Sequence, residues 1–598
     1  MLFGKHINKY YKKYWYYFIS IFLVDGIVDF TQLLIPYFMG EAINKLVGGT
    51  FTMTTTDGTM SDFTFYLLAI ALIGVIMVGG RIGWRMLSAR IGAHVSYDMR
   101  KELFIHTQNL DLSFYKDKKV GGLLSYFTND VETIKTLYSE GIIWLTDLVV
   151  LGVLAFVLMF IMAWKITLIA VIPMTLFIIL GVVFGKGEST RYKAANDSFE
   201  NLSDYSEESF QGFSVVKSYR KEQARLDSFR SLSRDTEVKN IGYQRYSSLI
   251  NTFTNFIIDA CYVILYFCIC HAIISEDPSF APNITQVGDM TTFVGYFGTI
   301  VWPMIAGGML IDYISRGRGA YKRISSILDA EPEVVDKEDA YAPDEIKGEI
   351  KFDHLNFRYP DAEEGIYALK DISLKIEPGE MIGILGRTGS GKSTLVNLLP
   401  KLYNVDPGTL SIDGVDLNDW NQKKLKKMIG FVSQDSFLFS GTIAESVSFA
   451  DPNPEIDKER VVSACRFACI DDEIERDFAE GYDTVLGEKG QTVSGGQRQR
   501  LSIARAVYKD PDLLIMDDSL SAVDASTEKE ILDNIRRDRQ GKTTIIVAHR
   551  ISALERMDKI ICMDGGKIIG FGTHDELYSS LKFYRDIADM QELEKEIV

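Results

Sequence analysis

Two kinds of hydrophobic pattern divide this chain into halves. In the first half, apolar residues form long runs, and six of these could cross a bilayer, because a spanning helix needs about 20 such residues. The predicted membrane helices cover approximately residues 14–39, 63–87, 141–163, 166–185, 249–274 and 290–311. From about residue 348 onward, short apolar runs alternate with amphipathic stretches. This second pattern is typical of an α/β domain.

Positive charge alternates between the loops that join the predicted membrane helices. The N-terminal arm and the connections from helix two to three and from four to five are rich in Lys and Arg. The other loops carry only Lys45, only Lys165 and no basic residue. The positive-inside rule therefore places both termini and both long loops in the cytoplasm. Breaks in the pattern near 110–119 and 204–212 predict a short transverse helix at the far end of each long loop.

Acidic residues interrupt several of the apolar runs. Asp25 and Asp29 are four residues apart and so share one face of the first helix, while Asp147 and Asp259 lie in the third and fifth. A carboxylate at membrane depth is costly and usually faces a cavity or a partner. The alternatives are that some of them lie at interfacial depth, or that they pair with arginines of the second helix or with each other.

Aromatic residues accompany these carboxylates and could offer stacking surfaces to an aromatic cation. The residues predicted to line a substrate cavity are Asp25, Asp29, Asp259, Phe297 and Trp302. Packing within the membrane domain is the alternative role for the aromatic members.

A glycine-rich stretch between a predicted strand and a predicted helix indicates a phosphate-binding loop. Its residues are Gly386, Arg387, Thr388, Gly389, Ser390, Gly391, Lys392 and Ser393, with Thr394 following. They match G-x-x-x-x-G-K-[ST], in which backbone N–H groups and a helix N-terminus surround a phosphate. Lys392 can reach the terminal phosphates, and the Ser393 hydroxyl can bind Mg²⁺. The sequence therefore predicts a nucleotide site.

Further candidates follow strands or begin a helix in the same half. Tyr359 ends a strand and can stack on adenine, Gln434 can complete Mg²⁺ or water coordination, and Asp517 ends a buried strand, where it can hold the Mg²⁺ shell. His549 follows the apolar strand Thr543–Ala548 and can bind a γ-phosphate. A second anion site is predicted at a helix N-terminus, formed by Ser494, Gly495, Gly496 and Gln497. Two such sites make sense if one faces the nucleotide of another subunit.

Together and in this order, these motifs resemble the exporter type of ABC transporter. The resemblance implies a six-helix membrane domain (1–328) with transverse coupling helices, a linker (329–347) and an α/β P-loop nucleotide-binding domain (348–598). It also implies that ATP and Mg²⁺ are the cofactors and that the chain dimerises. Thr484–Gly490 resembles the loop that contacts the coupling helices in such exporters.

One residue departs from the family pattern. In ABC transporters a glutamate normally follows the aspartate at the end of the Walker B strand, whereas this chain has Asp518. Its carboxylate is one carbon–carbon bond shorter, about 1.5 Å, and a misplacement of about an ångström can cost on the order of 100-fold in rate. The resemblance therefore favours a heterodimer in which Asp518 and His549 belong to a slow or degenerate ATP site and a different partner chain carries the glutamate.

Composition argues against two further kinds of function, binding of nucleic acid and binding of a metal by cysteines. The formal net charge is -17 over 598 residues, which argues against nucleic acid as a partner. The six cysteines show no metal-ligand spacing. The resemblance to ABC exporters implies a multi-pass protein of a bacterial plasma membrane that couples ATP hydrolysis to export, and together with the acidic and aromatic membrane residues it leads us to expect amphipathic, cationic, drug-like substrates. A lipid or peptide exporter, a homodimeric exporter and an ATP-binding regulatory subunit that gates a catalytic partner remain the alternatives.

Overall fold

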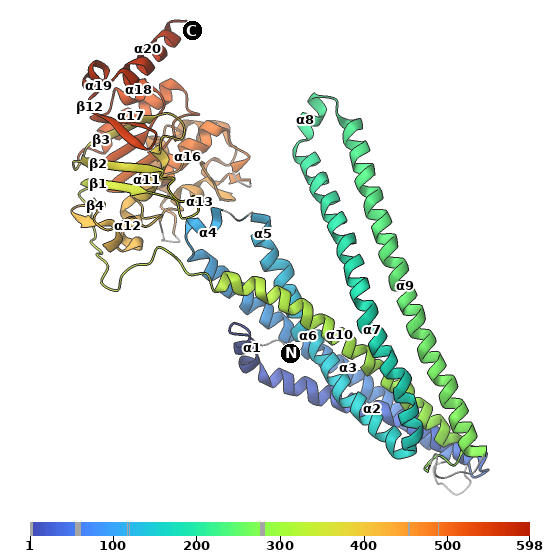
Figure 1. Cartoon of the computed structure of the whole chain (residues 1–598). Coiled ribbons are helices and arrows are strands. Elements are labelled where there is room, and N and C mark those ends of the chain that lie inside the picture. The colour runs from blue at the N-terminus through green and yellow to red at the C-terminus, as the bar shows by residue number, and fades with distance from the viewer. Residues whose placement is uncertain are drawn as a thin grey trace. The chain divides into compact units, whose positions relative to one another are not determined.

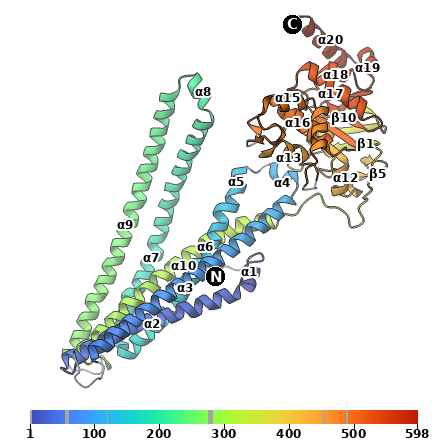
Figure 2. The same cartoon turned by 180° about the vertical axis from the view of Figure 1, so that it is seen from behind.

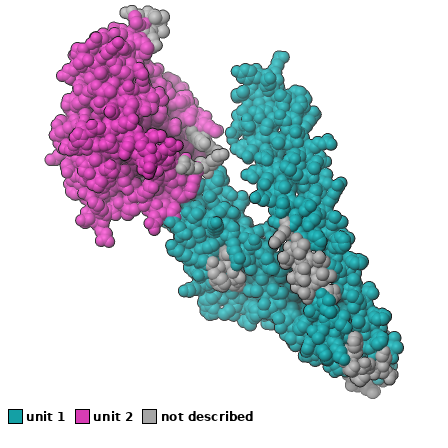
Figure 3. Space-filling view, viewed as in Figure 1, with its two compact units in different colours: residues 1–107, 120–329 teal, residues 108–119, 330–598 magenta. Residues whose placement is uncertain are grey.

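The structure is a computed structural model that describes residues 4–53, 61–116, 118, 120–274, 282–451, 455–487 and 490–597. Within these ranges the side chains of 120, 173–183, 186 and 594–597 are not described. The chain forms two compact units (Figure 3), one of residues 1–107 and 120–329 and the other of residues 108–119 and 330–598.

The first unit is entirely helical (Figure 1). Its helices are α1 (Asn8–Lys13), α2 (Trp15–Val47), α3 (Asp62–Gln108), α5 (Val120–Ser125), α6 (Val131–Thr146), α7 (Gly152–Gln211), α8 (Phe213–Ser218), α9 (Glu222–Ile274) and α10 (Val287–Leu328). Two π-helical turns, η1 (Tyr126–Asp130) and η2 (Asp147–Leu151), lie before and after α6. Helix α10 packs against α2, α6 and α7, while α7 and α9 lie side by side with α8 at the turn between them (Figures 1 and 2).

Within the described residues, five helices are long and apolar enough to cross a membrane. They are Trp15–Val47, Asp62–Gln108, Gly121–Ile172, Glu222–Ile274 and Val287–Leu328. The predicted fourth segment, 166–185, lies inside α7, and most of its side chains are outside the described set. Ala163 has non-helical angles (φ −154°, ψ 82°) and marks the turn between the predicted third and fourth segments.

The two predicted transverse helices differ in how well their positions agree with the structure. The first, near 110–119, corresponds to α4 (Leu112–Lys116), which belongs to the second unit. The region 204–212 is instead the end of α7, and the short helix α8 begins one residue later, at Phe213. Gly212 explains the shift, because its ψ of 18° ends the helical hydrogen-bond pattern there.

The second unit is an α/β domain built on three sheets. The central six-stranded sheet has the order β12-β11-β3-β10-β9-β6, and it is parallel except for the edge strand β12. A four-stranded antiparallel sheet has the order β2-β1-β4-β5, and β7 pairs with β8. The strands are β1 (Ile350–Phe357), β2 (Leu369–Ile376), β3 (Met381–Gly386), β4 (Leu410–Ile412), β5 (Val415–Asp416), β6 (Ile429–Val432), β7 (Gly441–Thr442), β8 (Val485–Leu486), β9 (Leu513–Asp517), β10 (Thr544–Val547), β11 (Lys559–Asp564) and β12 (Lys567–Gly572). This arrangement confirms the predicted fold class.

Helices cover the central sheet. They are α11 (Lys392–Leu398), α12 (Gln422–Met428), α13 (Ile443–Ser448), α14 (Lys458–Phe467), α15 (Asp471–Asp477), α16 (Gly495–Tyr508), α17 (Ala525–Asp538), α18 (Ile551–Leu554), α19 (His574–Ser580) and α20 (Lys582–Ile597). Side chains along β9 alternate between two hydrophobic cores, with Leu513 and Ile515 in one and Leu514 and Met516 in the other. Because both faces are buried, the strand is an uninterrupted apolar run that ends in Asp517.

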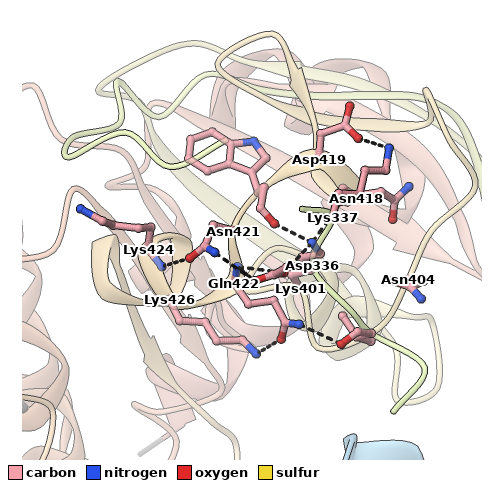
Figure 4. A network of polar contacts seen from close by, with 12 residues as sticks. Asp336, Lys337, Lys401, Asn404, Asn418, Asp419, Asn421, Gln422, Lys424 and Lys426 are labelled. Atoms are coloured by element: carbon pink, nitrogen blue, oxygen red, sulfur yellow. Dashed lines mark hydrogen bonds and ion pairs between the residues drawn. The ribbon is translucent and has the colours of Figure 1, made fainter. Parts of the chain in front are cut away.

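A polar network holds the segment that precedes β1 against the body of the second unit (Figure 4). The Lys401 side chain is 1% exposed, and its ammonium donates to Asp336 Oδ1 (3.2 Å) and to the carbonyls of Asn418 (3.1 Å) and Trp420 (2.6 Å). Asp336 also accepts from the backbone N–H of Gln422 at 3.0 Å. The linker is therefore held by a buried cation and its hydrogen bonds together with apolar contacts, such as that of Ile346 in the core of the domain.

Candidate functional site

The nucleotide-site residues gather at the carboxyl ends of β3, β9 and β10. These three strands are neighbours in the central sheet, and all are parallel. Gly386 ends β3, Asp517 ends β9, and His549 follows β10 by two residues. Ligands of open α/β sheets bind at this edge. The topology thus brings together residues that are more than 160 positions apart in the chain.

The lysine of the phosphate-binding loop donates hydrogen bonds to backbone carbonyls of the same loop. Lys392 is 7% exposed, and its ammonium donates to the carbonyls of Gly386 (2.7 Å) and Arg387 (3.1 Å). Burial lowers the pKa of Lys392, while the carboxylates of Asp517 and Asp518 oppose that shift. Gly391 has φ +99°, and an added Cβ would lie 2.9 Å from the Ala368 carbonyl, so only glycine fits this turn.

Two oxygen ligands suited to a hard cation lie next to each other. The Ser393 hydroxyl donates to Asp517 Oδ1 at 3.1 Å, and Asp517 is 3% exposed. Burial raises the pKa of Asp517, and the hydrogen bond from Ser393 opposes that shift. Ser390 Oγ is buried within the loop without a hydrogen-bond partner. An orphaned hydroxyl, a buried ammonium and a serine–aspartate pair fit a phosphate group with Mg²⁺.

Asp518 and its surroundings form the next turn of chain. Asp518 is half-buried and has φ +47°, which is unusual for a non-glycine residue. Its N–H donates to the Val547 carbonyl (3.3 Å), and its carbonyl accepts from the Ser521 hydroxyl (3.0 Å). Gln499 joins this turn to α16, because its Nε2 donates to Ser521 Oγ (3.1 Å) and its Oε1 accepts from the Ala522 N–H (2.9 Å).

Helix α16 begins with a capping box. Ser494 Oγ accepts from the Gln497 N–H (3.2 Å), and Gln497 Oε1 accepts from the Ser494 N–H (2.9 Å). Glu473 of α15 supports this start, because it accepts from Gln497 Nε2 (3.1 Å) and pairs with Arg500 (2.7 Å). The hydrogen bond with Arg500 lowers the pKa of Glu473. Gly495 and Gly496 are left without side chains at the exposed positive end of the helix.

Tyr359 lies between the phosphate-binding loop and α4. Its hydroxyl is 3.0 Å from Thr394 Oγ1, and its ring packs against Tyr403 with 5.3 Å between centroids. The Lys116 ammonium lies 4.4 Å from the Tyr359 ring centroid and pairs with Asp361 at 2.8 Å. Lys116 was not among the predicted site residues, since nothing in its local sequence distinguishes it from other loop lysines.

The remaining predicted nucleotide residues are exposed. Gln434 follows β6, and His549 precedes α18. Gln591 of α20 fixes the backbone at His549, because its Nε2 donates to the His549 carbonyl (2.8 Å) and its Oε1 accepts from the Ile551 N–H (2.8 Å). Within Thr484–Gly490, residues 488 and 489 lie outside the described set.

The first unit contains a cavity of about 910 Å³ between α2, α3, α6 and α10. Asp25, Asp29 and Asp147 line it, and one oxygen from each lies within 4.8 Å of the others. We call these three residues the acidic cluster. Asp147 Oδ2 accepts from Trp302 Nε1 at 2.8 Å, whereas Oδ2 of Asp25 and Oδ2 of Asp29 are buried and have no hydrogen-bond partner within the described part of the chain.

The predicted cavity residues are only partly brought together. Asp25, Asp29 and Trp302 line the cavity, as does Asp147, which the sequence analysis had left out of the lining set. Asp259 is exposed on α9, and Phe297 is buried in a helix-packing core against Tyr262, so neither is among the lining residues. Sequence periodicity cannot find Asp147, because its position opposite Asp25 depends on how helices more than 100 residues apart pack.

Comparisons with known proteins agree across nearly the whole chain. A family model described as ABC transporter transmembrane region matches residues 18–304, and one described as ABC transporter matches residues 369–521. The "Probable multidrug resistance ABC transporter ATP-binding/permease protein YheI" of Bacillus subtilis (strain 168) is 32% identical over 98% of this chain and 97% of that protein. The "Multidrug resistance-like ATP-binding protein MdlA" of Escherichia coli (strain K12) is 31% identical over 98% of this chain and 96% of that protein. In fold, the chain is similar to a bacterial Atm1-family ABC exporter solved with ATP bound (TM-score 0.80, 22% identity, 97% of this chain and 98% of that one).

Proposed function

The chain belongs to the ABC exporters, with a membrane domain and an ATP-binding domain in one polypeptide, and we propose that it exports amphipathic, cationic, drug-like molecules as one half of a heterodimer. The observation that carries the substrate class is the acidic, tryptophan-lined cavity in the first unit. The names of the two relatives described above refer to multidrug resistance, and this supports drug-like molecules as the substrate class.

The nucleotide site supplies the energy for this transport. ATP bound with Mg²⁺ releases free energy when its terminal phosphoryl group is transferred to water. Lys392 would bind the phosphate oxygens, Ser393 and Asp517 would hold the metal, and Tyr359 would stack on the base. Asp518 and His549 would orient the attacking water and the γ-phosphate. The capped start of α16 would complete the site of the partner.

Asp518 supports the heterodimer. The side chain of Asp518 is one carbon–carbon bond shorter than the glutamate of the family, so we expect this site to hydrolyse ATP slowly and to retain it for long periods. Transport then requires a second ATP site that hydrolyses ATP efficiently. In this arrangement the Walker residues of this chain form the slow site. Its own Ser494–Gln497 completes the fast site, whose glutamate comes from the second chain. The membrane would be a bacterial plasma membrane, with the nucleotide domain in the cytoplasm.

A co-purification experiment tests the heterodimer. The full chain is tagged, extracted gently from native membranes and analysed by mass spectrometry for stoichiometric companions. We expect a second, similar chain with glutamate after its Walker B aspartate. Recovery of this chain alone, as a dimer that hydrolyses ATP, would contradict the heterodimer and leave two identical Asp518 sites to do the work.

A transport assay tests the substrate class. Inside-out membrane vesicles containing the complex should accumulate a cationic dye such as ethidium only when ATP is present. The matched control is Lys392→Ala, which removes the ammonium that would bind phosphate in this chain's site and should lower accumulation. Accumulation of neutral lipids or peptides, and of no cationic dye, would refute the proposed substrate class.

A further inference from the structure

The acidic cluster has features of a binding site for a positively charged nitrogen. Asp25 and Asp29 are 2% and 3% exposed, and each keeps one buried carboxylate oxygen without a hydrogen-bond partner. A buried charged group is stable only when it is paired or hydrogen-bonded. Among the described residues none donates a hydrogen bond to these two oxygens, although the charge of Arg81 lies near both carboxylates, and the oxygens therefore point to a missing hydrogen-bonding positive partner.

The nearby arginines do not fill that role. Arg81 lines the cavity, and its guanidinium donates to Gln32 Oε1 at 3.3 Å. Arg85 stacks over Trp84 at 5.5 Å. The other lining cation, Lys135, pairs with Glu132 at 2.7 Å. Each positive lining group thus has a contact elsewhere, and the two aspartate oxygens stay available.

The spacing of the cluster matches an ammonium group. Three hydrogen bonds of about 2.8 Å, directed tetrahedrally from one –NH₃⁺, place their acceptor oxygens about 4.6 Å apart. The oxygens of Asp25, Asp29 and Asp147 lie within 4.8 Å of one another. Trp302 orients the carboxylate of Asp147 through its 2.8 Å hydrogen bond to Oδ2. Asp147 also begins the π-helical turn η2, a local irregularity that often occurs at functional sites.

The surrounding cavity favours an organic ion over a lone metal ion. Its volume of about 910 Å³ suits a drug-sized ligand, for which pockets of roughly 300–1,000 Å³ are usual. Trp84, Trp144 and Trp302 line it, and the rings of Trp144 and Trp302 are 5.3 Å apart. Aromatic faces attract organic cations and bury the apolar body that carries them.

We propose that Asp25, Asp29 and Asp147 bind the ammonium group of the exported substrate, while Trp144 and Trp302 contact its apolar part. This inference rests on the proposed export function and specifies it. It predicts that the protein binds a primary amine more tightly than an uncharged derivative of the same molecule. It also predicts that these three carboxylates cause the difference in affinity.

The test compares two fluorescent probes, dansylcadaverine and its N-acetyl derivative, in which a neutral acetamide replaces the charged terminal ammonium. Binding to the full-length protein in lipid nanodiscs, together with any subunit that co-purifies, is followed by energy transfer from tryptophan to the dansyl group. The wild type should bind the amine at least tenfold more tightly than the acetylated form. Asp25→Asn and Asp29→Asn should each lower the affinity for the amine about tenfold and leave that for the acetylated form unchanged. Unchanged binding of the neutral probe shows that the cavity is intact.

Asp259→Asn is the matched control, because it removes the same charge from an exposed position on α9 away from the cavity. It should leave the preference for the amine as in the wild type. Equal binding of both probes by the wild type, or an undiminished preference in both cavity variants, would overturn the assignment. Loss of amine binding on addition of millimolar Mg²⁺, but not of butylammonium, would assign the cluster to an inorganic cation instead. If one variant fails to fold, the other supplies the same comparison.

Vesicle transport of the two probes separates this inference from the proposed function. ATP-dependent accumulation of both probes at equal rates would leave the export function standing and contradict an ammonium site. Amine-selective binding without ATP-dependent accumulation of either probe would support the site and contradict drug export.

Discussion

Hydrogen bonds hold the backbone of Asp518 through both its N–H and its carbonyl. Its φ of +47° and the hydrogen bonds of its N–H and carbonyl fix the backbone, so its side chain cannot move forward to replace the missing methylene. We therefore expect Asp518→Glu to raise the ATP turnover of this chain's site, by about 10- to 100-fold. Steady-state hydrolysis and the retention time of bound nucleotide in the purified complex provide the measurement.

Asp564→Glu is the matched control for that change, since Asp564 is exposed at the end of β11, a strand of the same sheet that is not adjacent to β9. It should alter neither quantity. Unchanged turnover and unchanged retention in Asp518→Glu would show that the shorter acid does not limit this site.

The Lys116 ammonium lies over the Tyr359 ring, on which we propose that adenine stacks. The Lys116 ammonium lies 4.4 Å from the Tyr359 centroid, and such a contact is worth about 0.5–1 kcal/mol at an exposed site. If adenine stacks on this face it must displace the ammonium, so Lys116→Met should tighten ATP binding by about two- to fivefold. Equilibrium titration with a fluorescent ATP analogue measures the change.

Lys118→Met is the control, because Lys118 lies over Phe114 rather than Tyr359. Weaker binding in Lys116→Met would mean instead that the ammonium assists the nucleotide.

At the scale of elements, α15 and α16 are joined by one partly buried ion pair. Arg500 holds the pKa of Glu473 below its usual value of 4.5. Since the folded pKa is the lower one, the pair stabilises the domain above about pH 4.5, and that contribution is lost as the pH falls through the folded value. Glu473→Gln should lower the Tm of the nucleotide domain at pH 7 by about 2–4 °C, which corresponds to about 1 kcal/mol.

Scanning calorimetry of the full chain at pH 7 and pH 4 checks this expectation. The difference between wild type and variant should shrink at the lower pH. Asp477→Asn breaks an exposed pair with Arg476 on the same helix and should change the Tm little. A variant as stable as the wild type at pH 7 would contradict the supporting role of Glu473.

The elements that sequence predicts best are those whose signal is local. The P-loop, the strand that ends in Asp517 and the start of α16 at Ser494 consist of consecutive residues whose chemistry fixes their conformation. Asp147 was named as a membrane carboxylate but not assigned to the cavity, and Lys116 was not assigned to the nucleotide site, because their partners Asp25 and Tyr359 lie 122 and 243 residues away. Phe297 was predicted to line the cavity but is buried in a helix-packing core, since periodicity cannot tell which neighbour a buried face meets.

At the scale of the molecule, the linker is held to the second unit by Lys401. Lys401→Met removes the ammonium that donates to Asp336 Oδ1 and to the carbonyls of Asn418 and Trp420, so three hydrogen bonds are lost and Asp336 Oδ1 keeps only the backbone N–H of Gln422 as a donor in this network. We expect the variant to be cut faster by trypsin or chymotrypsin between residues 330 and 347, and to lose about 2–3 kcal/mol of stability. Limited proteolysis followed by mass spectrometry locates the cuts.

Lys424→Met is the control, because Lys424 makes an exposed pair with Asp344 of the same linker. Equal cleavage in both variants would show that Lys401 is not the residue that holds the segment.

The second unit is formed by two separate stretches of the chain, and this limits how a nucleotide domain can be exchanged between exporters by recombination. Residues 108–119 belong to it, and Asp111 accepts hydrogen bonds from the backbone N–H groups of Glu333 and Val334. A recombination event that joined a foreign nucleotide domain at residue 330 would leave Asp111 and Lys116 behind. Such a hybrid would inherit the P-loop, yet it would lack the native partners of its linker and of Tyr359. A nucleotide domain that keeps these contacts must therefore be exchanged as residues 330–598 together with the twelve residues 108–119.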